Sequence, residues 1–124
     1  MVVVCKQSVD PSTLEKTDSQ SKEDEIIICA ACRTGITDPD RQIIINNSFL
    51  HTFVNPHGYV FEIGCFSNAR GVRPASISSN EFSWFVGYSW EIGVCHNCST
   101  HLGWIFSSGS DLFFGLILEK LIFP

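Results

Sequence analysis

Four of the six cysteines form two C-x-x-C pairs, Cys29 with Cys32 and Cys95 with Cys98. Cysteine thiolates are common zinc ligands, and a C-x-x-C turn places two of them on one side of an ion. Two such turns complete the tetrahedral shell of a structural site, which leaves no open position for water or substrate. The spacing therefore predicts one structural zinc ion per chain, held by these four cysteines.

The cysteines and histidines also suit other roles. Six cysteines in a short chain would also suit three disulfides, but the close C-x-x-C spacing favours metal chelation. Cys5 and Cys65 have no role in the zinc scheme, and Cys65 lies in a strand pattern as a small buried apolar residue. His96 and His101 adjoin the second pair and are not needed as ligands, so we expect them to be solvated or packed in loops.

All three tryptophans lie within the stretch FSWFVGYSWEIGVCHNCSTHLGWIF, which also contains the second cysteine pair. Large rings concentrated in this way are expected either to pack together in a core or to line the binding site of one ligand. Strand alternation places Trp104 and Phe106 on one face. Glycines beside large rings favour a box with space inside it. The glycines nearest the tryptophans are Gly87, Gly93 and Gly103.

The rest of the chain has the pattern of an all-β protein. Ile26–Ile28 is a β-branched run that leads into the first cysteine pair, and Phe49–Val54 and Tyr59–Phe66 flank an Asn-Pro-His-Gly turn as a hairpin. Residues 67–81 are expected to form a long loop. No segment has a sustained helical period, so antiparallel sheets are predicted. Further strands are expected at Gln42–Asn46, Phe82–Phe85, Tyr88–Val94, His101–Ser107 and Leu112–Ile122.

Composition separates a tail from one folded domain. The chain has 124 residues, 44% of them hydrophobic, which suits a single core. Residues 1–25 contain six acidic residues, three lysines and no aromatic residue, which predicts a disordered tail before a domain at residues 26–124. The net charge is −5, and the domain has no basic stripe to follow a phosphate backbone. Nucleic acid is therefore not an expected partner.

Membrane and secretion signals are not recognisable in the sequence. The apolar start Met1–Val4 is shorter than the ~7–15 residues of a signal-peptide core, and the C-terminal apolar run is shorter than the ~20 residues of a spanning helix. We expect a cytoplasmic monomer that does not bind membranes, and a secreted protein if the N-terminus is processed or incomplete.

The order and spacing of several motifs carry a family resemblance. CAAC, NPHGY, FSWF-x-GY-x-W and C-x-x-C-x-x-HLGW-x-F resemble the CULT domain family, the thalidomide-binding domains of cereblon, over roughly Ile26 to Ile122. The resemblance implies a β-tent of two antiparallel sheets pinned by a four-cysteine zinc site. It also implies a tri-tryptophan cage for cyclic imides, such as glutarimide or a modified protein C-terminus, or for uracil-like rings.

The resemblance also implies roles for individual residues. The imide would be bound by the main-chain carbonyl of Phe82 and the amide of Trp84, with Ser83 between them, and Asn55 and Pro56 would approach larger ligands. Phe82 departs from cereblon, which has a histidine there. The Lon-like and helical regions that connect cereblon to a ubiquitin ligase have no counterpart here, so the resemblance does not imply ligase function. The cage walls would be Trp84, Trp90, Trp104 and Phe106.

Two alternatives to a non-catalytic binding module remain. Zinc-pinned tents include methionine sulfoxide reductases, which need a reactive thiol beside an aromatic pocket, and Cys65 is the one domain cysteine outside the zinc set. No base or cation near Cys65 in sequence would lower its pKa. The other alternative is a Yippee-like interaction domain, stabilised by zinc and without a small ligand.

Overall fold

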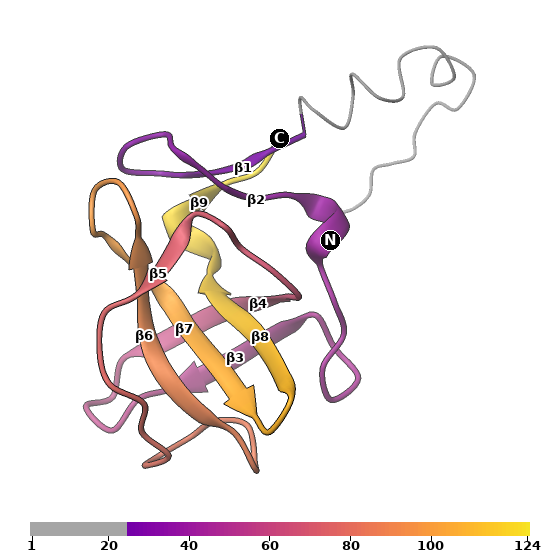
Figure 1. The fold of residues 1–124 in the computed structure, drawn as a ribbon, viewed down its shortest axis with the longest axis vertical. Coiled ribbons are helices and arrows are strands. Elements are labelled where there is room, and N and C mark those ends of the chain that lie inside the picture. Colours follow the sequence, from indigo (N-terminus) through magenta and orange to yellow (C-terminus); the bar gives the residue numbers. More distant parts are fainter. Residues whose placement is uncertain (1–24) are drawn as a thin grey trace.

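The computed structural model describes residues 25–124, so the predicted tail lies outside the described residues except for Glu25. The described chain forms two antiparallel sheets (Figure 1), which confirms the predicted all-β fold. The strands are β1 (Ile27–Cys29), β2 (Gly35–Thr37), β3 (Leu50–Val54), β4 (Val60–Phe66), β5 (Val72–Pro74), β6 (Ser89–Cys95), β7 (His101–Ser108), β8 (Asp111–Ile117) and β9 (Leu121–Ile122). Two short 3-10 helices, η3 (Pro39–Arg41) and η4 (Leu118–Lys120), connect them.

The two sheets differ in size and in their place in the molecule. The smaller sheet has the strand order β2-β1-β9 and lies across one end of the larger sheet, at the top of Figure 1. The larger sheet has the order β3-β4-β8-β7-β6-β5. The first two strands of residues 25–124 and the last one therefore lie in the smaller sheet, and the larger sheet is built from the segment between.

The expected hairpin forms between β3 and β4. Its register pairs Phe53 with Phe61 and Val54 with Val60, on either side of the Asn-Pro-His-Gly turn. Asn55 stabilises this turn, because its side-chain oxygen accepts hydrogen bonds from the His57 and Tyr59 amides, both at 2.9 Å.

Three expectations about local structure were wrong. Gln42–Asn46 forms no strand and makes only isolated bridges. Phe82–Phe85 is a turn, because Phe82 has a φ of 56°, in the left-handed region, which interrupts an extended chain. The predicted strand Leu112–Ile122 is divided by η4 into β8 and β9, which belong to different sheets. In addition, the expected loop at residues 67–81 contains β5, whose Pro74 is tolerated because β5 is an edge strand.

The core consists of two apolar clusters. One joins the smaller sheet to the larger one, and Ile27 and Ile36 pack in it with Phe66 and Leu116. The other cluster is largely aromatic, and it contains Phe85, Phe106 and Phe113. Neighbouring residues of β7 face different clusters, as strand alternation requires: Ile105 packs in the first, and Trp104 and Phe106 pack in or against the second. No helix within residues 25–124 has the length and hydropathy needed to cross a membrane.

Candidate metal centre and aromatic site

The four predicted zinc ligands meet at one point. The Sγ atoms of Cys29, Cys32, Cys95 and Cys98 all lie within 4.8 Å of one another. The Cys29–Cys98 distance is 3.8 Å and the Cys32–Cys95 distance is 3.6 Å. These distances exceed the length of a disulfide, about 2.05 Å. They match the edge of a tetrahedron with metal–sulfur bonds of about 2.3 Å, roughly 3.8 Å. The cluster therefore has the size needed to bind one metal ion.

The two cysteine turns have the same backbone geometry. The Cys29 carbonyl accepts from the Arg33 amide at 2.8 Å, and the Cys95 carbonyl accepts from the Ser99 amide at 2.9 Å. Both Arg33 and Ser99 have positive φ, 68° and 66°. The first turn lies between β1 and β2 and the second between β6 and β7 (Figure 1), so the cluster is made of cysteines from both sheets.

A threonine follows each cysteine pair at the same spacing. The Sγ of Cys32 lies 3.1 Å from the Thr34 hydroxyl, and the Sγ of Cys98 lies 3.0 Å from the Thr100 hydroxyl. A hydroxyl in this position can donate a hydrogen bond to a metal-bound thiolate and so fix its orientation. Sequence reasoning missed both threonines, although the repeated pattern C-x-x-C-x-T would have identified them.

The surroundings of the thiols favour thiolates at two of the four positions. Hydrogen bonding by the Asn97 side chain and by Thr34 lowers the pKa of Cys32 to about 5. Hydrogen bonding by Thr100 also lowers the pKa of Cys98. Burial has the opposite effect on Cys29, whose pKa rises to about 11. A bound cation would offset this cost, because it stabilises the thiolate form of every ligand.

The remaining domain cysteine, Cys65, lies apart from this cluster. Cys65 is fully buried in the aromatic core cluster, and desolvation raises its pKa to about 12. His101, next to the second turn, is half-buried, and its Nε2 lies 3.0 Å from the Gly103 carbonyl. Its ring packs against Trp104 edge to face, with centroids 4.9 Å apart. His96 is exposed on the second turn.

Two of the predicted cage tryptophans are in direct contact. Trp84 and Trp104 pack edge to face with ring centroids 4.7 Å apart, so no further ring lies between them in this arrangement. Phe61 packs edge to face on Trp104 at 5.2 Å, and Phe53 stacks almost parallel on Trp84 at 4.8 Å. Sequence reasoning missed Phe53 and Phe61. Their alternation on two paired strands indicated that they share a face, but not which face.

The other two predicted cage residues are Trp90 and Phe106. Trp90 pairs with Phe106 in the register of β6 and β7, two positions along from the pairing of Ile92 with Trp104, so its side chain lies on the same face as Trp104. Phe106 is only 1% exposed and stacks on Phe113, so it is part of the core.

The turn before Trp84 presents backbone groups. Phe82 is 73% exposed, and Ser83 holds the turn because its hydroxyl donates to the Phe85 carbonyl at 3.1 Å. Within residues 25–124, neither the Phe82 carbonyl nor the Trp84 amide takes part in a hydrogen bond. The indole N–H groups of Trp84 and Trp90, by contrast, donate to the carbonyls of Val54 and Glu81, at 3.3 and 2.8 Å.

The glycines near these rings do not all leave space for a ligand. A Cβ on Gly93 would lie 2.8 Å from Val72, and one on Gly103 would lie 2.8 Å from the Leu116 backbone. These two glycines therefore allow strands to approach one another. Gly87 has open space around it and a φ of 86°, so a turn conformation accounts for it.

Comparison with known proteins points to cereblon. The cereblon of Danio rerio is 45% identical over 75 residues and that of Gallus gallus 41% identical over 75 residues, each covering 56% of this chain. The cereblon of Drosophila melanogaster is 29% identical over 111 residues, which cover 83% of the chain. The described domain is cereblon-like.

This similarity is confined to one part of the relatives. The chain spans 17% of the Danio rerio and Gallus gallus cereblons and 19% of the Drosophila melanogaster protein. No protein-family model matches the chain. The chain therefore contains a cereblon-like domain with four clustered cysteines.

Proposed function

We propose that this chain is a zinc-stabilised, non-catalytic module that binds a cyclic imide, such as a glutarimide or a modified protein C-terminus, or a uracil-like ring. The observation that carries the proposal is the free backbone pair beside the tryptophans: the Phe82 carbonyl and the Trp84 amide have no hydrogen-bond partner within residues 25–124. An imide offers the complementary N–H donor and carbonyl acceptor.

The aromatic residues would supply the apolar part of the site. The indole N–H groups of Trp84 and Trp90 are engaged by backbone carbonyls, so these rings offer mainly their faces to a ligand. A ring that enters between Trp84 and Trp104 has to separate them, because their centroids are 4.7 Å apart. Stacking on the freed faces would offset this cost.

The metal would act as a structural element. Four cysteine ligands fill a tetrahedral zinc shell, and the sulfur–sulfur distances fit such a shell. Bound zinc would supply rigidity and no Lewis-acid chemistry, because no coordination position remains for a substrate. The role of the cysteines is then to hold β6 and β7, which carry Trp90 and Trp104, in a fixed relation to the smaller sheet.

Catalysis by a cysteine is the alternative that the geometry favours less. A sulfoxide reductase needs an accessible thiolate, whereas Cys65 is fully buried and its pKa is raised to about 12. We expect no reduction of a methionine sulfoxide peptide with a thiol reductant. Turnover that is lost in Cys65→Ser would support the enzyme instead.

Tryptophan fluorescence during a glutarimide titration tests the binding function. At roughly −0.7 kcal/mol per non-hydrogen atom, glutarimide should bind with about −6 kcal/mol, a dissociation constant of tens of micromolar. Trp104→Ala or Trp90→Ala should cost ~2 kcal/mol or more of binding, and Phe123→Ala, at the C-terminal end, should bind like the parent. A Yippee-like interaction domain would give no saturable change with any variant.

A further inference from the structure

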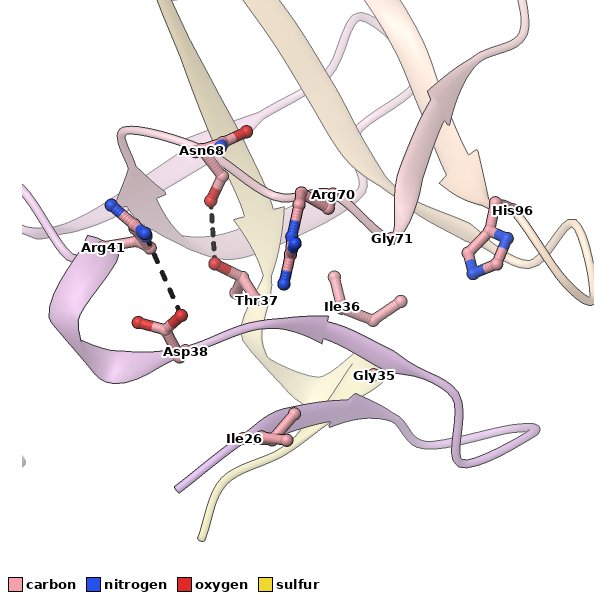
Figure 2. Close-up of a pocket in the computed structure, with 10 residues that line it drawn as sticks. All are labelled: Ile26, Gly35, Ile36, Thr37, Asp38, Arg41, Asn68, Arg70, Gly71 and His96. Atoms are coloured by element: carbon pink, nitrogen blue, oxygen red, sulfur yellow. Dashed lines mark hydrogen bonds and ion pairs between the residues drawn. The ribbon is translucent and has the colours of Figure 1, made fainter. Parts of the chain in front are cut away.

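A cavity lies away from the tryptophans. A cavity of about 570 Å³ opens between the smaller sheet and the loop from β4 to β5 (Figure 2). This volume is within the range of about 300–1,000 Å³ that small-molecule sites occupy. The residues that line it are Ile26, Gly35, Ile36, Thr37, Asp38, Arg41, Asn68, Arg70, Gly71 and His96.

Backbone hydrogen bonds hold the walls of this cavity together. The Thr37 hydroxyl donates to the Asn68 carbonyl at 2.7 Å, and the Gly71 amide donates to the Ile36 carbonyl at 3.0 Å. The His96 amide in turn donates to the Gly71 carbonyl at 2.9 Å. These bonds tie β2, the β4–β5 loop and the second cysteine turn to one another, so the cavity is preformed and does not depend on one mobile side chain.

The charge of the cavity is mainly positive. Arg41 and Arg70 lie on the two sides of the Thr37–Asn68 hydrogen bond in Figure 2, and Arg70 points into the cavity. Arginine is always charged in proteins and can bind an oxyanion through two parallel N–H groups. Asp38 is the one acidic residue among those that line the cavity.

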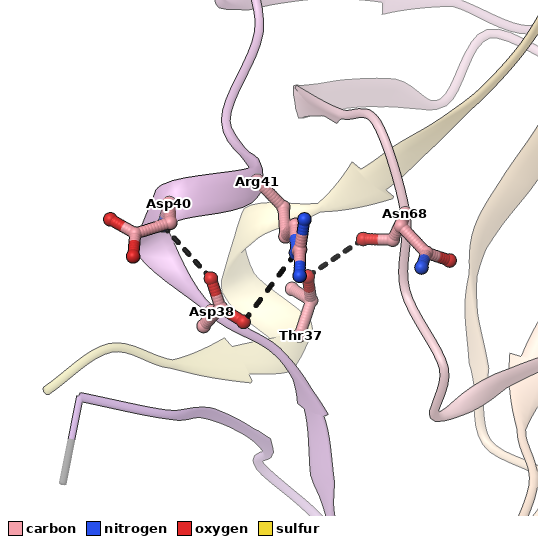
Figure 3. Close-up of polar contacts among 5 residues, drawn as sticks. All are labelled: Thr37, Asp38, Asp40, Arg41 and Asn68. Atoms are coloured by element: carbon pink, nitrogen blue, oxygen red, sulfur yellow. Dashed lines mark hydrogen bonds and ion pairs between the residues drawn. The ribbon is translucent and has the colours of Figure 1, made fainter. Parts of the chain in front are cut away.

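Only one of the two arginines has an acidic partner. The Nε of Arg41 lies 3.8 Å from Asp38, whose carboxylate also accepts from the Asp40 amide at 3.0 Å (Figure 3). Within residues 25–124, Arg70 makes neither an ion pair nor a hydrogen bond. Its neighbours Ala69 and Gly71 are buried, so the backbone that carries Arg70 is fixed although its guanidinium is not.

An apolar surface lies beside these charges. Ile26 is 44% exposed and lies at the edge of the cavity on the strand side, and Ile36, which is 2% exposed, forms part of its wall (Figure 2). A site with a guanidinium at one end and isoleucine at the other suits a ligand with both a charged group and a hydrocarbon part.

We propose that this cavity binds a small organic anion, with its carboxylate or phosphate group at Arg70 and Arg41 and its hydrocarbon part against Ile26. The site is separate from the tryptophans, so it would operate whether or not the chain binds an imide.

Heteronuclear NMR on the full zinc-bound chain tests this proposal with aliphatic probes that do not imitate an imide. Butyrate and butyl phosphate are titrated separately, which distinguishes the carboxylate from the phosphate, and butan-1-ol serves as the neutral analogue of the same shape. We expect saturable shifts of the Thr37 and Gly71 amides with at least one anion. We expect no such shifts with butan-1-ol.

Matched arginine variants locate the binding. Arg70→Gln should weaken the binding of the anion at least about tenfold, because a charged hydrogen-bonding partner is lost, and Arg70→Lys should weaken it less. Arg73→Gln is the control, since the Arg73 guanidinium is exposed, bonds to the Ser99 hydroxyl at 2.8 Å and does not line the cavity. Each variant is checked for an unchanged fold by its amide spectrum.

The proposal is overturned by three results. The first is that butan-1-ol shifts the Thr37 and Gly71 amides as much as the anions do. The second is that Arg70→Gln binds the anion as tightly as the parent does. The third is that Arg73→Gln loses as much anion affinity as Arg70→Gln. Failure of glutarimide to bind would leave this site unaffected, because no residue of the tryptophan region lines it.

Discussion

At the scale of single residues, the metal centre depends on more than its four ligands. Each cysteine turn repeats a positive φ at the residue after its second cysteine, and each repeats a threonine hydroxyl at 3.0–3.1 Å from that cysteine's sulfur. This repetition in two turns far apart in sequence indicates that both are shaped for the same task. The threonines would fix the orientation of the thiolates and reduce their basicity.

Removal of these hydroxyls should weaken the metal centre without destroying it. We expect Thr34→Val and Thr100→Val each to lower the affinity for zinc by about 10-fold, as is usual for groups that hold a metal ligand in place. Competition with a chromophoric chelator measures this change. Thr52→Val, on the edge strand β3, is the control. If Thr34→Val and Thr100→Val bind zinc as tightly as this control, the threonines do not support the metal site.

Loss of a ligand should be far more damaging. Cys98→Ser should lower the unfolding temperature strongly and lower zinc content below one ion per chain, because zinc contributes ~10–16 kcal/mol in small structural sites. That amount is comparable to the whole stability of a domain, ~5–15 kcal/mol. Thermal unfolding with metal analysis gives the answer, and an unchanged melting temperature would show that the cysteines do not stabilise the fold.

At the scale of elements, the hairpin β3–β4 supports the turn that carries Trp84. Phe53 stacks on Trp84 at 4.8 Å with an interplanar angle of 8°, and the carbonyl of Val54 accepts from the Trp84 indole at 3.3 Å. The hairpin therefore contributes two separate contacts to one tryptophan. Phe61 also contacts Trp104 on β7. The hairpin therefore packs against both Trp84 and Trp104.

A double-mutant cycle measures this support. Phe53→Leu and Trp84→Leu, alone and together, should reveal a coupling of about 0.5–1.5 kcal/mol in the free energy of unfolding, as is typical of aromatic pairs. Urea unfolding of the four proteins gives the coupling. Phe53→Leu paired with Trp90→Leu is the control, because no ring contact joins Phe53 to Trp90 within the described chain, and equal coupling in both cycles would contradict the stacking.

The elements also show how far sequence reasoning reached. The hairpin, the β6 and β7 strands and the cysteine turns were predicted because apolar alternation and turn residues are local signals. The division of the C-terminal run into β8 and β9 was not predicted. The chain changes sheet at η4 because β9 pairs with β1 in the smaller sheet, and such a long-range pairing leaves no local signal in the sequence. The near-complete burial of Phe106 was not predicted for a similar reason: alternation gives the face of a strand but not the depth of a side chain.

At the scale of the whole molecule, the cysteine cluster joins the ends of the domain to its centre. Cys29 lies in the smaller sheet and Cys95 at the end of β6 in the larger one, so a shared ion would close a long loop of chain. A strong chelator should therefore unfold the domain as a unit, with β-sheet circular dichroism and tryptophan fluorescence lost together. Loss of only one signal would indicate that the sheets are stable separately.

The tail is expected to contribute little to this unit. Deletion of residues 1–24, which lie outside the described chain, should change the free energy of unfolding by less than about 1 kcal/mol. Urea unfolding of the shortened and full chains gives the comparison, and a larger loss of stability would assign the tail a structural part in the domain.

The central claim is that the tryptophans and the Phe82–Trp84 backbone form an imide site, and the most direct test compares glutarimide with N-methylglutarimide by isothermal titration calorimetry. Methylation removes the N–H donor for the Phe82 carbonyl and places a methyl group where that hydrogen bond would form, while it keeps the rest of the ring. We predict that glutarimide binds with a dissociation constant of tens of micromolar and that the methyl analogue shows no binding, a difference of at least about tenfold. Equal binding of the two compounds, or binding of neither, would contradict the account.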